Sequence, residues 1–185
     1  MRDVIYLMNL SLDGFIEGPD GKFEWTHPDE EIHRFHNRTA DEMGAFLYGR
    51  RLYETMAVWQ TWGDDASLPD YVREFARVWR SKPKIVFSTT LTAVGEGCRL
   101  VRGEVGAEVS RLKRESGGDL SVGGPGLASA LARLDLIDEY RLVIYPILVG
   151  GGKSYYPPLA GPVPLRLLET RTFARGAVYL RYRRA

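Results

Sequence analysis

Two glycine-rich segments stand where a predicted strand passes into a predicted helix, at Gly49-Arg50-Arg51 and at Gly123-Gly124-Pro125. Glycine leaves room for a phosphate beside the backbone, and the free N–H groups of a helix start donate hydrogen bonds to it. The arginines add planar guanidinium groups that bind phosphate oxygens through two parallel hydrogen bonds. Together the segments predict a dinucleotide site. Packing alone also explains glycine at such turns, and adjacent arginines are also typical of a solvated surface.

Other motifs with known chemistry are incomplete in this sequence. Gly150-Gly151-Gly152-Lys153-Ser154 ends like a nucleotide-triphosphate P-loop, but the glycine required six residues before the lysine is replaced by Ile147. The segment therefore favours a turn at a pocket edge or a subunit contact. A Rossmann fingerprint after Gly124 also fails, because Ser129 occupies its third small position and no acid follows about 20 residues later.

Composition and charge narrow the class of protein further. The chain has 185 residues, 44% of them hydrophobic, and 25 basic residues balance 24 acidic ones. A near-neutral balance gives no electrostatic basis for nucleic-acid binding, and no apolar run reaches the roughly 20 residues of a membrane span. A single cysteine, Cys98, favours the cytoplasm, and the three histidines form no recognised metal-binding pattern. We expect one cytoplasmic domain over residues 1–185, with a small-molecule substrate and no metal.

Hydrophobic periodicity predicts an α/β fold. Apolar runs predict strands at 4–10, 45–48, 84–87, 100–101, 120–122 and 139–149, and a C-terminal hairpin at 165–174 and 177–182. Helical spacing, caps and glycine stops predict helices that open at Pro28, Arg50, Ser67, Val105 and Leu127. Strands alternating with helices indicate a mostly parallel sheet, and the hairpin adds an antiparallel edge.

Three short motifs together resemble a known superfamily. They are Ser11-Leu12-Asp13-Gly14, Gly49-Arg50-Arg51-Leu52-Tyr53-Glu54 and Val122-Gly123-Gly124-Pro125, each at a strand end. The chain resembles dihydrofolate-reductase-like proteins over essentially its whole length. More narrowly, it is similar to the C-terminal reductase domain of riboflavin-biosynthesis deaminase/reductases and its stand-alone bacterial relatives. The resemblance implies a three-layer fold with a twisted, mostly parallel sheet, helices on both faces, and NADPH across the carboxyl ends of the strands.

The resemblance also assigns cofactor contacts. It implies pyrophosphate and 2′-phosphate contacts from Gly49, Arg50 and Arg51, and further 2′-phosphate contacts from Ser88 and Thr89. It implies close passage of the cofactor at Gly123 and Gly124, and a nicotinamide edge formed by Asn9 and Ile16.

A proton donor is expected among three carboxyl groups. The segment Trp25-Thr26-His27-Pro28-Asp29-Glu30 matches a dihydrofolate-reductase pattern that nominates Glu30, whereas counting back four residues from Phe35 nominates Glu31. A carboxyl in an apolar cleft has a raised pKa, which suits proton transfer near neutral pH. Asp13 lies beside the implied nicotinamide and would orient substrate. Helix capping by the two glutamates and turn capping by Asp13 stay open as alternatives.

Departures from the family pattern bear on the substrate. The lysine expected before the Ser-Leu-Asp-Gly turn is absent, and Val122 stands where a glutamate is expected. The leading hypothesis is an NADPH-dependent 5-amino-6-(5-phosphoribosylamino)uracil reductase; dihydrofolate or another pterin is the alternative substrate. A non-catalytic NADPH-binding module is the alternative of another class.

The apolar run 142–145 and the proline-rich arm 155–164 favour a homodimer.

Overall fold

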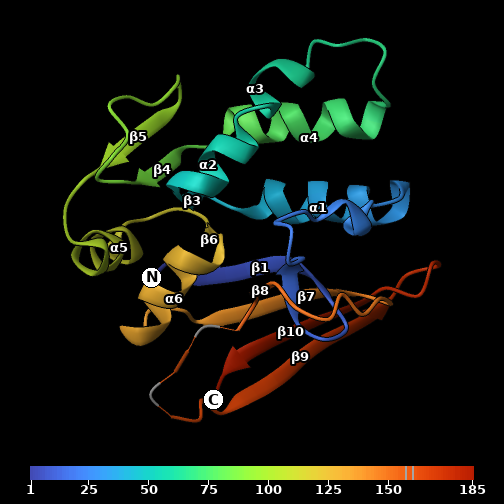
Figure 1. Cartoon of the computed structure of the whole chain (residues 1–185). Helices are drawn as coiled ribbons and strands as arrows, with labels where there is room; N and C mark the ends of the chain where they lie inside the picture. Colours follow the sequence, from blue (N-terminus) through green and yellow to red (C-terminus); the bar gives the residue numbers. More distant parts are fainter. Residues whose placement is uncertain (157, 160) are drawn as a thin grey trace.

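An eight-stranded sheet forms the centre of the protein, and helices cover both of its faces (Figure 1). The structure is a computed structural model that describes residues 1–156, 158–159 and 161–185. The strand order is β5-β4-β3-β6-β1-β7-β10-β9, and the pairs from β5 to β7 are all parallel. β10 runs antiparallel to both β7 and β9. The predicted mostly parallel sheet with an antiparallel C-terminal hairpin is confirmed.

The elements have the following bounds. The strands are β1 Val4–Ser11, β2 Phe15–Glu17, β3 Ala45–Gly49, β4 Lys84–Phe87, β5 Cys98–Val101, β6 Leu120–Gly123, β7 Glu139–Tyr145, β8 Lys153–Ser154, β9 Leu165–Thr172 and β10 Val178–Arg184. The helices are η1 Glu24–Thr26 (a 3-10 helix), α1 Glu30–Glu42, α2 Arg50–Met56, α3 Trp59–Trp62, α4 Asp70–Ser81, α5 Val105–Arg114 and α6 Pro125–Arg133.

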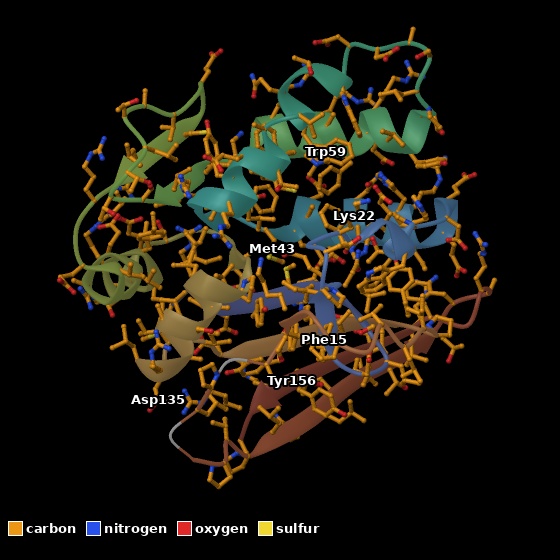
Figure 2. The ribbon with its side chains drawn as sticks, viewed as in Figure 1. Phe15, Lys22, Met43, Trp59, Asp135 and Tyr156 are labelled. Atoms are coloured by element: carbon orange, nitrogen blue, oxygen red, sulfur yellow. The ribbon has the colours of Figure 1, made fainter. Side chains whose placement is uncertain are left out.

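β1 lies at the middle of the sheet and is apolar on both faces. Val4 and Tyr6 pack with α5 and α6 in the largest core cluster, whereas Ile5 points to the opposite face and packs with the α1 and α4 side chains. Figure 2 shows side chains filling the layer between the sheet and α1, including Met43, which is 4% exposed. A parallel strand covered by helices on both faces requires the nearly continuous apolar sequence of β1.

Several predicted boundaries differ from the structure by a few residues, and two of these differences have a clear physical cause. β7 ends at Tyr145 rather than at residue 149, because Pro146 follows and has no backbone N–H for the ladder. α1 begins at Glu30, after Pro28, because the Asp29 carboxylate accepts a hydrogen bond from the Ile32 N–H at 3.0 Å and forms the N-cap.

A small second sheet, formed by β2 and β8, was not predicted. It joins the loop after β1 to the Gly150-Gly151-Gly152 turn, and Lys153 forms an ion pair with Glu17 at 2.5 Å. Gly152 has a φ of +125°, and a Cβ there would lie 2.0 Å from the Glu17 carbonyl oxygen. The glycine-rich turn therefore permits close backbone packing against β2.

Candidate active site

Four neighbouring strands end at one edge of the sheet and bring most of the predicted cofactor residues together. β4, β3, β6 and β1 are adjacent and parallel, and the register pairs Gly49 with Phe87 and Tyr48 with Gly123. Ser88 therefore follows its strand beside Gly49, and Gly123 ends the next strand. In open α/β sheets, ligands bind at this carboxyl edge where connections leave for opposite faces. Here α1 lies on one face and α6 on the other (Figure 1).

Gly49 and the two arginines after it form the start of α2. Gly49 has ordinary extended backbone angles, and a Cβ there would lie 3.9 Å from the Leu127 Cβ, which is normal contact. The protein itself therefore does not require glycine at this position. Arg50 and Arg51 are exposed, and no ion pair within the described residues includes either guanidinium. Both charges are available to an anionic ligand.

The glycines at the end of β6 have structural reasons of their own. A Cβ on Gly123 would lie 2.3 Å from the Leu52 Cδ2, so glycine lets α2 pack closely on β6. Gly124 has a φ of +85°, a conformation that favours glycine, and it is the N-cap of α6. Packing and turn geometry thus already account for both residues.

Ser88 and Thr89 lie in the turn after β4. The Ser88 Oγ accepts hydrogen bonds from the backbone N–H groups of Thr90 at 3.2 Å and Leu91 at 3.1 Å. This arrangement holds the turn, while the serine hydroxyl can still donate its own hydrogen. Thr89 is exposed.

Asn9 and Ile16, the implied nicotinamide neighbours, have different environments. The Asn9 Oδ1 is buried and has no hydrogen-bond partner among the described residues. Such an atom carries a desolvation cost until a partner reaches it. Ile16 is 4% exposed and packs within the largest core cluster.

The Asp13 carboxylate is fully engaged with neighbouring turns. It accepts hydrogen bonds from the Ser11 Oγ at 2.5 Å, the Gly150 N–H at 2.8 Å and the Val149 N–H at 3.2 Å. These hydrogen bonds hold the pKa of Asp13 below its ordinary value, and the bond from Ser11 has the largest effect. The geometry matches the turn-capping alternative and ties the end of β1 to the loop after β7.

Both glutamates at the start of α1 are paired with arginines. Glu30 accepts a hydrogen bond from the Arg34 Nε at 2.8 Å. Glu31 accepts hydrogen bonds from the Ala174 N–H at 3.0 Å and the Arg171 guanidinium at 2.8 Å. These two bonds lower the pKa of Glu31. The expected rise of its pKa is therefore wrong, because the side chain meets the β9–β10 hairpin instead of an apolar cleft.

Sequence reasoning missed four further buried polar atoms. No hydrogen-bond partner among the described residues is found for the Trp25 Nε1, the His36 Nε2, the Arg73 Nε and the Tyr145 hydroxyl. Burial lowers the pKa of His36 to about 4, so its imidazole is neutral at neutral pH. In the sequence, Trp25 stands out only as the first residue of the Trp-Thr-His-Pro-Asp-Glu segment, and Tyr145 resembles any aromatic residue of a buried strand. Only the pairing of β1 with β7 shows that Tyr145 shares a face with Asn9.

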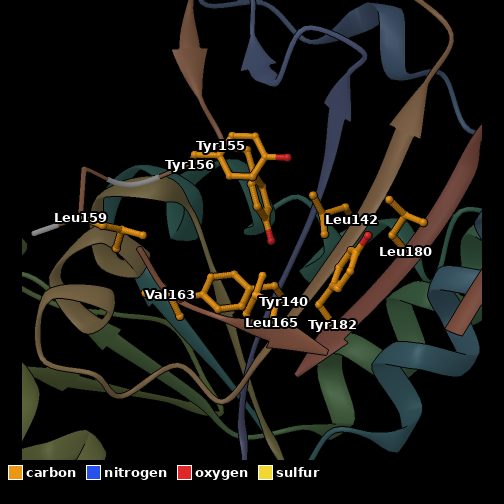
Figure 3. Close-up of a pocket in the computed structure, with 9 residues that line it drawn as sticks. All are labelled: Tyr140, Leu142, Tyr155, Tyr156, Leu159, Val163, Leu165, Leu180 and Tyr182. Atoms are coloured by element: carbon orange, nitrogen blue, oxygen red, sulfur yellow. The ribbon is translucent and has the colours of Figure 1, made fainter. Parts of the chain in front are cut away.

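A separate cavity of about 310 Å³ lies against the C-terminal strands (Figure 3). Its walls are tyrosines and aliphatic side chains from β7, β9, β10 and the segment after β8: Tyr140, Leu142, Tyr155, Tyr156, Leu159, Val163, Leu165, Leu180 and Tyr182. The register places Leu142 and Leu180 opposite each other, on the face away from Val143 and α1. The cavity therefore belongs to the other side of the sheet from Asn9 and Tyr145.

Two negative findings apply to the residues that the structure describes. They contain no group of three or more histidine, cysteine, aspartate or glutamate side chains arranged to hold a metal ion. Within the same residues, no helix has both the length and the apolar character needed to cross a membrane.

The sheet order and its two helical layers form a dihydrofolate-reductase-like fold. The dihydrofolate reductase of Enterococcus faecalis complexed with NADP(H) has a similar fold, with a TM-score of 0.66 and 16% identity over 98% of this chain and 96% of that chain. A Shewanella sp. PV-4 protein, whose name assigns it provisionally to riboflavin biosynthesis, gives a TM-score of 0.79 at 24% identity and covers 100% and 99% of the two chains.

The chain belongs to the RibD C-terminal domain family, which matches residues 2–179. It is also 32% identical to the uncharacterized protein YyaP of Bacillus subtilis over 98% of this chain and 94% of that protein. The resemblance drawn from the three sequence motifs is confirmed.

Proposed function

We propose that this protein is an NADPH-dependent reductase whose cofactor lies along the carboxyl ends of β4, β3, β6 and β1. The observation that carries the proposal is the start of α2, where Arg50 and Arg51 have no acidic partner among the described residues. Gly49, directly before them, has no packing reason to be glycine. An anionic group bound there explains both features.

The other nominated residues fit the same cofactor. The Ser88 hydroxyl and Thr89 lie on the neighbouring strand end, where they would add donors to the 2′-phosphate. The Asn9 amide would meet the nicotinamide end, which would give its buried Oδ1 a hydrogen-bond partner. Ile16 and Gly124 would shape the walls. When bound, NADPH supplies a hydride; the chain's own residues bind the cofactor, orient the substrate and exclude water.

Family membership favours 5-amino-6-(5-phosphoribosylamino)uracil reduction, with dihydrofolate or another pterin as the alternative substrate. The proposed proton donor is Glu30 or Glu31 in the first turn of α1. The ion pair of the donor with its arginine would open when substrate binds. Asp13 would position the loop after β1 through its bonds to Ser11 and Gly150.

The arginine assignment is tested with Arg50→Ala and Arg51→Ala, made separately. Charge-assisted hydrogen bonds contribute about 1.5–3 kcal/mol each, so loss of the 2′-phosphate contact should weaken NADPH binding about 10- to 100-fold while sparing NADH. Fluorescence titration with both cofactors measures this. Equal affinity of the wild type for NADPH and NADH, or indifference of both variants, would refute the assignment.

Turnover separates the enzyme from a non-catalytic NADPH-binding module. NADPH oxidation with a pyrimidine or pterin substrate supports the enzyme. Tight NADPH binding without oxidation across both substrate classes supports the module.

We further propose a cytoplasmic homodimer, whose interface differs from the one expected from the runs 142–145 and 155–164. The run 142–145 lies in β7, which is interior to the sheet, and all of its side chains except the half-buried Ile144 are buried. Exposed leucines instead lie on the edge strand β9, at Leu165, Leu167 and Leu168. The arm 155–164 adds exposed Tyr156 and Leu159, although residues 157 and 160 lie outside the described part. Sedimentation equilibrium measures the oligomeric state.

A further inference from the structure

We infer that the cavity on the face of β7, β10 and β9 away from α1 is an accessory binding site for a neutral, flat molecule of two fused aromatic rings, and that its occupation restrains the turn after β1. The cavity has a volume of about 310 Å³. None of its lining residues contributes to the cofactor, substrate or proton contacts of the proposed function. The inference therefore goes beyond that function and is tested without cofactor.

The cavity has a buried floor and an exposed mouth. Tyr140, Leu142 and Tyr155 form the floor, with 9%, 4% and 0% of their surfaces exposed. Tyr156 and Leu165 at the mouth are 59% and 42% exposed. Figure 3 shows the lining side chains around one space, with Tyr155 and Tyr156 on one side and Leu165 on the other. A small molecule therefore has a path from solvent to the buried floor.

Size and lining define the core of the ligand. An apolar cavity of about 150 Å³ holds one benzene ring, so a cavity of about 310 Å³ has room for two fused rings. Tyrosines and aliphatic side chains form all of the walls. Aromatic walls favour an aromatic ligand, because stacked and edge-to-face ring pairs stabilise beyond the burial of apolar area. The Tyr6 and Tyr155 rings, stacked with centroids 4.4 Å apart, already show this preference beside the cavity.

The walls disfavour a charged ligand. Within the described part of the chain, no charged side chain lines the cavity. Arg184 and Asp135, whose charges act on the Tyr140 hydroxyl, pair with each other at 3.0 Å. Burial raises the pKa of Tyr140 and of Tyr156, which is the effect of surroundings that disfavour charge. An ionised ligand would lose its hydration without gaining a counter-ion, so the site selects a neutral molecule.

Two tyrosine hydroxyls are available to a polar substituent on the ring. The Tyr155 hydroxyl is already used, because it donates to the Tyr6 carbonyl oxygen at 3.2 Å. The hydroxyls of Tyr140 and Tyr182 form no hydrogen bond among residues 1–156, 158–159 and 161–185. A phenolic hydroxyl both donates and accepts, so a ring with one hydroxyl group fits the site.

The wall formed by Tyr155 and Tyr156 also holds the turn after β1. The Tyr155 N–H donates to the Gly14 carbonyl oxygen at 2.9 Å, and a Cβ on Gly14 would lie 3.3 Å from the Tyr156 Cε2. Gly14 has a φ of +88° and directly follows Asp13. A ring bound against this wall restricts both tyrosines and therefore the turn that they contact.

Three compounds of similar size test the ligand class: 2-naphthol, the anionic 2-naphthoate and the saturated decahydro-2-naphthol. Calorimetry or ligand-observed NMR measures their binding to the protein without cofactor. We expect 2-naphthol to bind with a Kd of about 1 mM or tighter, the affinity of a well-fitting ligand of roughly a dozen heavy atoms. 2-Naphthoate should bind at least about tenfold more weakly, and the saturated alcohol at least about threefold more weakly.

Variants locate the binding in this cavity. Leu180 is half-buried and lines the cavity, so Leu180→Phe should fill part of it and weaken 2-naphthol binding by about tenfold or more. Leu100→Phe is the matched control, because Leu100 is a half-buried leucine of the edge strand β5, outside the cavity. That variant should bind 2-naphthol normally. Tyr182→Phe keeps the ring, removes one hydroxyl and should weaken binding roughly two- to tenfold.

Hydrogen exchange tests the restraint on the turn. Saturation with 2-naphthol should slow exchange in residues 13–17 and leave β5 unchanged. Binding of 2-naphthol with unchanged exchange in residues 13–17 would overturn the proposed restraint.

The competing occupant of the cavity is a second copy of this chain, because Tyr156, Leu159 and Leu165 also belong to the proposed dimer surface. Binding is therefore repeated at protein concentrations below and above those at which sedimentation equilibrium shows a dimer. Loss of 2-naphthol binding as the dimer forms would overturn the inference. No binding of 2-naphthol, equal binding of the three compounds, or normal binding by both Leu180→Phe and Tyr182→Phe would also overturn it.

Discussion

Replacing the glycines at two neighbouring strand ends by alanine should affect stability at one position and cofactor binding at the other. Gly123 touches the Leu52 side chain of α2, whereas Gly49 has only a normal contact with Leu127. The same added methyl group therefore tests packing at one position and the ligand at the other. Gly123→Ala should destabilise the fold, and Gly49→Ala should chiefly impair cofactor binding.

The magnitudes follow from the contacts. An alanine Cβ at position 123 would lie 2.3 Å from the Leu52 Cδ2 and 3.4 Å from the Tyr48 Cε1, so Leu52 must move. Overpacking costs about 1–3 kcal/mol, and the lower end applies here because the Leu52 Cδ2 is the end of a flexible, half-buried side chain. At Gly49 the extended backbone suits alanine, and reduced unfolded-chain entropy contributes about 0.4–1 kcal/mol. Loss of a good N-cap residue offsets that gain, which leaves stability within about 0.5 kcal/mol.

Urea unfolding and NADPH titration of the two variants separate these effects. Gly49→Ala should bind NADPH about tenfold more weakly, a loss of about 1.4 kcal/mol, because its methyl group would occupy the proposed approach of the phosphate. The double variant Gly123→Ala/Leu52→Ala should recover about 1 kcal/mol relative to the sum of the single changes, since removing the Leu52 side chain removes the clash.

Specific results would refute this reasoning. Normal NADPH binding by Gly49→Ala would show that the cofactor does not approach this position. Unchanged stability of Gly123→Ala, or additive effects in the double variant, would show that the Leu52 contact does not constrain β6.

Two further predictions concern α1 and the loop before it. Glu31→Gln should lower the free energy of unfolding at neutral pH. Because the folded-state pKa of Glu31 lies below its ordinary value, the difference between variant and wild type should shrink as the pH falls through that lowered pKa. A difference in unfolding free energy that is equal at pH 7 and pH 3 would contradict this prediction. The loop 13–25 is expected to act as a lid. Because β2 in this loop already pairs with β8, NADPH should slow hydrogen exchange mainly in residues 18–24. Unchanged exchange in residues 18–24 of protein saturated with cofactor would exclude a lid.

The sequence predicted the elements whose patterns are local. β1 is recognisable because both of its faces are buried, which makes Val4 to Leu10 almost continuously apolar. The C-terminal hairpin was predicted from two apolar runs around Arg175-Gly176, and Gly176 has a φ of +84° in that turn. The short motifs at strand ends identified the family, because glycine at a strand-to-helix junction reflects local backbone geometry.

The tertiary structure decided which polar groups are engaged and which are unpaired. Glu139 and Arg141 belong to a predicted strand, yet only the pairing of β7 with β10 brings Arg181 to the same buried carboxylate. Likewise, Glu31 was nominated as a proton donor from its position, but Arg171 lies 140 residues away in sequence. An ion pair between distant segments lowers a pKa that local apolar surroundings would raise. The hydrogen-bonding state of a side chain therefore depends on strand pairing and helix docking, which residue spacing along one segment does not encode.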